Sequence, residues 1–233
     1  MSMMVNHLTG FGVGDSDPYW SSVVLLLKCD GADASTTFTD RSKSQHSITA
    51  NGNAQVSTAQ SKFGGASLLL DGTGDFLSAA TNTNWAFGTG DFTVECWIRK
   101  TANGPDGYDN VISTADGAGS GTGGWWIEMS TSRGLDVHFS TATVMTATNT
   151  GWATDGTWHH VAMARSGTAL AFYIDGTSVA TATNSSDIAQ TVLRIGQEGI
   201  YEYAGYIDEI RITKGVARYT ANFTAPTAAF PVG

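Results

Sequence analysis

Carboxylates are the first candidates for chemistry in this sequence. A retaining glycoside hydrolase needs two carboxyl groups about 5 to 5.5 Å apart, which alternate positions of one strand can supply. None of the five glutamates begins such an alternating run of acids; they are Glu95, Glu128, Glu198, Glu202 and Glu209. Asp208 and Glu209 are adjacent, so a regular strand would place them on opposite faces. We therefore predict that the protein is not an enzyme.

The histidines offer little for metal binding or catalysis. His159 and His160 are adjacent, so in a strand they point to opposite sides and cannot both bind one ion. The sequence has no Ser or Cys in a nucleophile-elbow pattern and no phosphate-binding GxxxxGK[ST] motif. It therefore gives no support to covalent or phosphoryl-transfer catalysis.

Aromatic residues next to glycine-rich loops are the candidates for ligand binding. Trp125 and Trp126 follow the loop DGAGSGTGG, and Tyr201 and Tyr203 lie in the later segment GQEGIYEYAG. Their large amphipathic rings suit stacking on a sugar or contact with another protein. Because adjacent residues of a strand point in opposite directions, we also expect one of the two tryptophans to belong to the core.

The composition favours a sheet protein with one core. The chain has 233 residues, of which 41% are apolar and 14% charged, and it contains 28 glycines that suit turns. All-β sandwiches of this length commonly form one domain. Cys29 and Cys96 each lie in an apolar, strand-like run without the spacing of a metal site. We expect both to be buried free thiols.

Short apolar runs with period-two alternation must position these residues. The segment GDFTVECWIRKT is the clearest case, with Phe92, Val94, Cys96 and Ile98 on one side and Thr93, Glu95, Trp97 and Arg99 on the other. Similar runs recur between turns, and no helical period of useful length is present. The sequence therefore predicts an all-β fold, an antiparallel two-sheet jelly-roll sandwich of about 12–14 strands.

Charge and hydropathy exclude several classes of partner. The net charge is −9, and the twelve Lys and Arg residues are scattered singly, so the basic surface of a nucleic-acid-binding protein is missing. No stretch approaches the roughly 18 apolar residues of a membrane helix, so we expect no membrane insertion. The first twenty residues lack the basic and apolar segments of a signal peptide. We therefore expect synthesis in a cytoplasm without secretory export.

Four segments carry a resemblance to a known family: SKFGGASLLLDGTGDFL, FTVECWIRKT, TWHHVAMARSGTALAFYIDGT and GYIDEIRIT. In order and spacing they resemble the signature strands of laminin-G-like domains in the concanavalin A-like lectin/glucanase superfamily. The resemblance extends over residues 23–213 and implies a concanavalin A-like sandwich. We accordingly expect an N-terminal arm at residues 1–17, the sandwich at 18–213 and a C-terminal tail at 214–233.

The resemblance also implies a structural Ca²⁺ on the convex side, where the first and last strands are neighbours in related sandwiches. It assigns this ion to Asp30, the carbonyl of Gly31 and the carboxylate of Asp208, in the segments KCDG and YIDEI. Ca²⁺ prefers such mixtures of carboxylate and carbonyl oxygens.

Two alternatives to this calcium site remain open. Asp208 could instead cap a turn or form an ion pair with Arg211 or Lys28. A rim site could instead use Asp71 and Asp75, although the sequence DGTGD around them also reads as a plain hairpin turn.

The two ends of the chain suggest a setting. The segments DPYWSSVVLLLKCDG and TKGVARYTANFTAPTAAFP resemble the flanks of laminin-G-like proteins of tailed bacteriophages. This resemblance implies a non-enzymatic structural protein on the virion surface, as capsid decoration or as a tail or fibre component. Its partners would be capsid or tail proteins and further copies of itself. The alternative is a calcium-dependent carbohydrate-binding module that adheres to a host-surface glycan.

Overall fold

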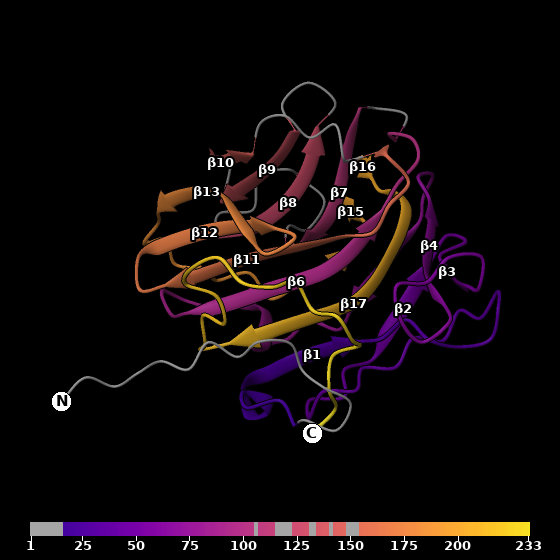
Figure 1. Cartoon of the computed structure of the whole chain (residues 1–233), viewed down its shortest axis with the longest axis horizontal. Helices are drawn as coiled ribbons and strands as arrows, with labels where there is room; N and C mark the ends of the chain where they lie inside the picture. Colours follow the sequence, from indigo (N-terminus) through magenta and orange to yellow (C-terminus); the bar gives the residue numbers. More distant parts are fainter. Residues whose placement is uncertain (1–15, 105–106, 115–122, 131–133, 140–141, 148–153) are drawn as a thin grey trace.

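The computed structural model describes residues 16–104, 107–114, 123–130, 134–139, 142–147 and 154–233 (Figure 1). Within these residues the chain forms seventeen strands and two short 3-10 helices. In chain order the elements are η1 (Trp20–Ser22), β1 (Val23–Leu27), β2 (Ile48–Asn51), β3 (Gln55–Ser57), β4 (Ser67–Asp71), β5 (Phe76–Ala79), η2 (Thr83–Trp85), β6 (Phe92–Arg99), β7 (Tyr108–Ser113), β8 (Trp125–Ser130), β9 (Gly134–Phe139), β10 (Ala142–Ala147), β11 (His159–Ser166), β12 (Ala169–Ile174), β13 (Thr177–Thr183), β14 (Leu193–Ile195), β15 (Gln197–Glu198), β16 (Tyr201–Glu202) and β17 (Ala204–Lys214).

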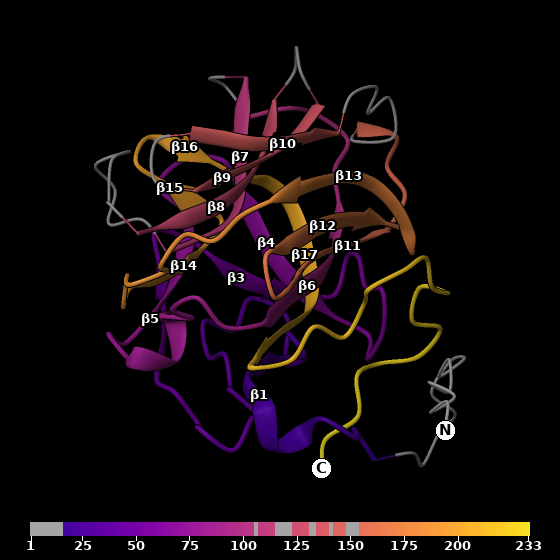
Figure 2. The same cartoon turned by 90° about the vertical axis from the view of Figure 1, so that its left-hand side faces the viewer.

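Two antiparallel sheets pack face to face as a sandwich (Figures 1 and 2). The eight-stranded sheet has the order β13-β12-β11-β6-β17-β4-β3, and β1 joins it by pairing with β17. The seven-stranded sheet has the order β10-β9-β8-β7-β14-β5-β2, and β15 and β16 form a separate hairpin. This confirms the all-β sandwich. The described strands outnumber the predicted 12–14 because several of them, such as β3, β15 and β16, are too short or too polar to show alternation.

The core lies between the two sheets and follows the alternation of the strands. Phe92, Val94, Cys96 and Ile98 of β6 all belong to the main core cluster, as their spacing predicts. In β8 and β9 the odd-numbered residues from Trp125 to Met129 and from Leu135 to Phe139 also face the core. The even-numbered residues of these two strands therefore lie on the outer face of the seven-stranded sheet. Cys29 and Cys96 are buried free thiols, as expected.

A β-bulge interrupts β17 in the middle of the eight-stranded sheet. Asp208 pairs with Trp97 and Arg211 with Glu95, so β17 has one extra residue between these pairs. Glu209 takes up the bulge with a φ of 49°. Ile207 and Ile210 both face the core, so Asp208 and Glu209 between them both lie on the outer side. The prediction that these two acids point to opposite faces is wrong, because it assumed a regular strand.

The C-terminal tail packs onto the outer face of the eight-stranded sheet, as Figure 2 shows for the yellow segment. The ring of Tyr219 stacks on Phe223 with a centroid distance of 3.6 Å, and both rings lie against Tyr173 of β12. Further along, Phe230 is 1% exposed and packs with Leu26 of β1. Residues 214–233 therefore form an outer layer of the domain, whereas residues 1–15 of the expected N-terminal arm lie outside the described residues.

A buried ionic network holds this tail in place. Glu95 accepts hydrogen bonds from the guanidinium of Arg211 at 2.9 Å and from the hydroxyl of Tyr219 at 2.8 Å. Asp17 accepts from Arg211 at 3.1 Å and from Arg218 at 2.7 Å. Burial by itself raises the pKa of Glu95, but the charges beside it, Arg211 first, hold that pKa well below its usual range. The tail is thus joined to the sheet by buried ion pairs, in which loss of one partner would leave the other charge uncompensated.

Candidate functional site on the outer face of the seven-stranded sheet

Acidic, amide and imidazole side chains meet on the outer face of the seven-stranded sheet. Glu128 of β8 pairs directly with Asp136 of β9 on one side and with Asn110 of β7 on the other. Two residues further along the strands, Trp126 pairs with His138. Side chains of directly opposed residues point to the same face, with Cβ atoms about 4.5 to 5.5 Å apart. The register of three strands therefore brings these five side chains together.

This polar cluster is compact and buried. One ligand atom from each of Glu128, Asp136 and His138 can be chosen so that all three lie within 4.8 Å of one another. The Nε2 atom of His138 is 3.7 Å from Oε1 of Glu128. The exposed fractions of the three residues are 4%, 0% and 8%. Such groups can bind a cation, but they are too enclosed to reach a glycosidic bond in a polysaccharide.

Aromatic packing fixes the position of the imidazole. The ring of Trp126 stacks on His138 with a centroid distance of 4.7 Å and an interplanar angle of 6°. Trp126 itself is 6% exposed, and its Nε1 atom has no hydrogen-bond partner. The stack keeps the His138 ring in one plane beside Glu128.

The hairpin β15–β16 lies next to this cluster, over β7. The hydroxyl of Ser113 donates a hydrogen bond of 2.8 Å to the carbonyl of Gln197, which ties the hairpin to the outer face of the sheet. The ring of Tyr201 packs against Tyr108 of β7 with a centroid distance of 5.0 Å. At the tip of the hairpin, Ile200 is 73% exposed. The hairpin thus presents an aromatic pair and an apolar tip to solvent.

Polar groups line the other side of the same hairpin. Arg194 of β14 donates a hydrogen bond of 3.0 Å to the side-chain oxygen of Gln197. The amide of Gln197 in turn donates to Glu202 at 3.0 Å. Glu202 also accepts a hydrogen bond of 2.7 Å from the backbone N–H of Gly74. A guanidinium, a buried amide and a carboxylate are therefore held in fixed positions on the face of the hairpin opposite to Tyr201.

A family model described as the concanavalin A-like lectin/glucanases superfamily matches residues 71–218, which is well over half of the chain. The chain belongs to this superfamily. A search of curated protein sequences found no match. Among the described residues of this superfamily member, no helix is long and apolar enough to cross a membrane.

Solved structures of two toxin binding domains and of one arabinanase domain share the fold. The binding domain of Paraclostridial Mosquitocidal Protein 1 is 14% identical, with a TM-score of 0.67, over 86% of this chain and 50% of that chain. The binding domain of botulinum neurotoxin DC in complex with SialylT is 15% identical, with a TM-score of 0.59, over 84% and 49%. Domain 4 of AbnA, an extracellular arabinanase from Geobacillus stearothermophilus, in complex with arabinotriose, is 18% identical, with a TM-score of 0.60, over 84% and 94%.

Because all three identities are low, these likenesses establish only the fold of the chain. The chain spans about half the length of the two toxin binding domains and nearly all of the arabinanase domain. The likeness to phage proteins that the ends of the sequence suggest is not among these findings.

The four predicted ligand-binding aromatic residues differ in their burial. Trp125 and Tyr203 are 0% exposed and belong to the main core, so they cannot stack on a ligand. Trp126 lies on the outer face but is covered and stacked on His138. Tyr201 is the one of the four that is half-buried. One of the adjacent tryptophans, Trp125, therefore belongs to the core, as expected. Tyr108, the aromatic partner of Tyr201, was not singled out from the sequence.

The predicted calcium residues Asp30 and Asp208 both lie beside one short segment, residues 62–64. Both oxygens of the buried Asp208 accept backbone hydrogen bonds, at 2.9 and 3.1 Å from Lys62 and Phe63 and at 2.8 Å from Glu209. Burial raises the pKa of Asp208 to about 7. These hydrogen bonds match the alternative in which Asp208 holds a turn, and a metal role for Asp208 stays a prediction.

Asp30 is the remaining part of that prediction. One carboxylate oxygen of Asp30, Oδ1, is buried without a hydrogen-bond partner, and the chain at Gly64 passes so close that a Cβ there would lie 1.9 Å from it. Gly31 follows in the same loop. Calcium at Asp30 and Gly31 stays a prediction. At the alternative rim position, Asp75 accepts hydrogen bonds from the backbone of Asn53 at 2.7 Å and of Asp71 at 3.0 Å, as a hairpin turn requires.

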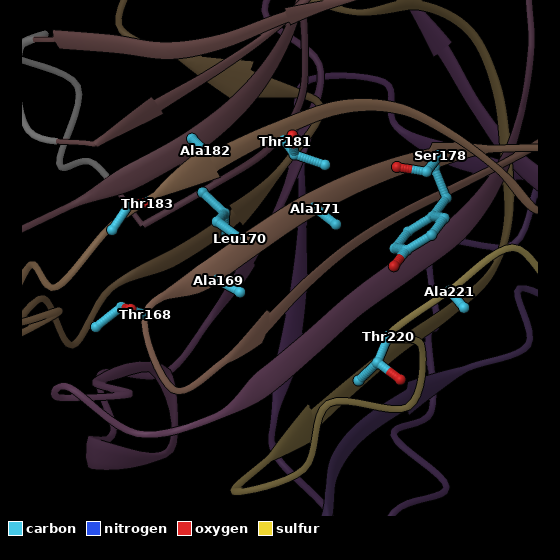
Figure 3. Close-up of a pocket in the computed structure, with 11 residues that line it drawn as sticks. Thr168, Ala169, Leu170, Ala171, Ser178, Thr181, Ala182, Thr183, Thr220 and Ala221 are labelled. Carbon is cyan, nitrogen blue, oxygen red and sulfur yellow. The ribbon is translucent and has the colours of Figure 1, made fainter.

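A shallow groove on the opposite side of the domain is less suited to recognition. It has a volume of about 510 Å³ and lies on the outer face of the eight-stranded sheet, between β12, β13 and the tail (Figure 3). Small side chains such as Ala171, Thr181 and Thr220 line it, and none of the described lining residues is charged. Its one aromatic ring, Tyr173, has its hydroxyl within 3.3 Å of the Tyr219 carbonyl.

The polar cluster was missed in the sequence because its members come from different strands. The pattern Trp126-x-Glu128 on one strand and Asp136-x-His138 on the next was visible, separated by a short connection. Read as a hairpin, this spacing places the four side chains on one face. A search for paired acids along one strand cannot find a pair that forms across two strands.

Proposed function

We propose that the protein is a non-enzymatic carbohydrate-binding module whose ligand site lies at the β15–β16 hairpin. The observation that carries this proposal is the half-buried ring pair of Tyr108 and Tyr201 on one face of the hairpin, with the ordered polar groups Arg194, Gln197 and Glu202 on its other face. Aromatic faces stack on the apolar faces of sugar rings, and fixed polar groups recognise hydroxyls. The hairpin supplies both kinds of contact within a few residues.

The similar structures support this reading. Domain 4 of the arabinanase AbnA is described in complex with arabinotriose, and the botulinum neurotoxin DC binding domain in complex with SialylT. Both share the fold of this chain. Burial of Glu128 and Asp136 also favours binding over hydrolysis, because a hydrolase must expose its acids to the substrate.

Glycan-array screening of the full chain, followed by titration of the best ligand, tests the proposal. We expect Tyr201→Ala to weaken binding roughly tenfold, since a lost aromatic contact is worth about 1 kcal/mol or more. The matched control is Tyr19→Ala, which removes an aromatic ring that is 37% exposed and packs on Arg218 beside the other sheet. Equal affinity for both variants, or no binding to any glycan, would overturn the proposal.

We place this binding role on a virion surface, as the ends of the sequence suggest. The C-terminal tail packs on its own domain, so the contact to a capsid or tail protein is expected elsewhere on the chain. Purification of the particles that carry the protein, with its neighbours found by cross-linking, tests the setting. Light scattering tests whether the chain forms a homo-oligomer. A monomer that never co-purifies with particles would refute the virion role and leave glycan binding untouched.

A further inference from the structure

The polar cluster beside the proposed glycan site has the geometry of a metal centre. Metal–ligand bonds of 2.0 to 2.2 Å place two ligands of one ion about 3 to 4.4 Å apart. The 3.7 Å between His138 Nε2 and Glu128 Oε1 lies within this range and is too long for a hydrogen bond. The candidate atom of Asp136 lies within 4.8 Å of both. Small rotations of these side chains would complete the coordination of an ion.

Asn110 gives independent support for a bound cation. Its side chain is 0% exposed, and neither its oxygen nor its nitrogen has a hydrogen-bond partner. A buried amide without a partner destabilises the fold, so such groups are normally paired. As the register partner of Glu128, Asn110 lies on the face that carries the cluster. An ion between these side chains would be coordinated by the amide oxygen.

The surroundings suit a fixed, dry site. The stack of Trp126 on His138, at 4.7 Å and 6°, sets the plane in which the imidazole nitrogen is presented. The potential ligands Asn110, Glu128, Asp136 and His138 are each less than 9% exposed. Rigid ligands shielded from water hold an ion in one geometry, which is what a metal centre requires.

We propose that Glu128, Asp136, His138 and the side-chain oxygen of Asn110 bind a divalent transition-metal cation of the Mn²⁺ or Zn²⁺ class. One imidazole nitrogen with carboxylate and amide oxygens is a mixed donor set that these ions accept. Ca²⁺ is a poorer match because it prefers six to eight oxygen ligands. This site is distinct from the position predicted for calcium at Asp30, and it does not depend on glycan binding.

Metal titration of the full chain tests the inference. After treatment with chelator, the protein is titrated with MnCl₂ and ZnCl₂ in separate calorimetric experiments, with CaCl₂ as a comparison, and metal content is measured after dialysis. We expect one Mn²⁺ or Zn²⁺ per chain. Glu128→Gln and His138→Ala should each weaken this binding at least tenfold, as the loss of a ligand removes more than an outer-shell contact does.

The matched control is His159→Ala. His159 also lies near two acids, Asp155 and Asp175, at 3.2 and 2.7 Å, but on the other sheet. This variant should keep the metal. Glu128→Gln preserves shape, and thermal unfolding shows whether each variant is folded. Equal binding by the wild type and a folded Glu128→Gln variant, loss of metal only in His159→Ala, or no stoichiometric binding would overturn the inference. Because no glycan is used, these outcomes are separate from those of the proposed function.

Discussion

One glycine in the body of the domain forms a hydrogen bond with the tail, and its replacement gives a quantitative test of the fold. Gly176 lies in the turn between β12 and β13 with a φ of 81°, and Asp175 before it has a φ of 50°. Two positive φ values mark the tight turn that Asp-Gly favours in hairpins. The carbonyl of Gly176 accepts a 2.8 Å hydrogen bond from Phe223, and a Cβ at Gly176 would lie 2.0 Å from the Phe223 carbonyl oxygen. Gly176→Ala must therefore displace the tail.

The expected destabilisation has three parts. An alanine in the left-handed region loses about 1 to 2 kcal/mol, and the broken hydrogen bond about 1 kcal/mol. Displacement of the half-buried Phe223 ring adds about 1 to 2 kcal/mol of lost burial. Gly167→Ala is the matched control, because Gly167 has a φ of 58° and nothing within 4 Å of its Cβ position. The two variants should therefore differ by about 2 to 3 kcal/mol.

Differential scanning calorimetry measures this difference. For a domain of this size, 1 kcal/mol changes the melting temperature by about 2 to 4 °C, so Gly176→Ala should melt roughly 4 to 12 °C below Gly167→Ala. Limited proteolysis should also cleave the tail faster in Gly176→Ala. Equal melting temperatures with equal proteolysis would refute the argument that the tail is an integral layer.

Three further predictions concern buried charge and metal. Glu95→Gln should lower the free energy of unfolding by about 3 kcal/mol in denaturant titration, because it leaves Arg211 without its main partner. The control Asp155→Asn, in the more exposed pair with His159, should change the free energy of unfolding by less than about 1 kcal/mol. The raised pKa of Asp208, about 7 in the folded state, means that the folded protein holds its proton more tightly than the unfolded chain. The wild type should therefore lose about 2 to 3 kcal/mol of stability relative to Asp208→Asn between pH 5 and pH 8, and a pH-independent difference would contradict the assignment. If Asp30 and Gly31 hold calcium, CaCl₂ should raise the melting temperature of the wild type and not that of Asp30→Asn; no shift in either protein counts against the calcium site.

Strand β6 shows how much of the fold the local alternation of residues can predict. Its alternation predicted both the strand and its buried face, from Phe92 to Ile98, because each side chain of a strand points opposite to the one before it. The same rule failed at Asp208 and Glu209, where a bulge adds a residue. A bulge of this kind depends on the partner strands and has no signature in the segment itself.

The candidate site was predicted only in part, for a related reason. Tyr201 was chosen from its residue type and its loop, and it lies at the surface. Trp125 and Tyr203 were chosen on the same grounds and are buried, because residue type does not say which face of a strand turns inward. Tyr108 and Asn110 carried no local signal, since their roles depend on neighbours in β8 and β16.

By itself, the sequence determined that this chain is an all-β sandwich with its apolar faces turned inward, and four of its segments resemble those of the lectin-like superfamily. The sandwich and its inward faces follow from alternation and turn residues, which act over a few positions. Tertiary structure alone decided that Glu128, Asp136 and His138 converge, and that the tail is bound through Glu95 and Arg211. Such contacts join residues from different strands, and strand register and packing set which of them meet.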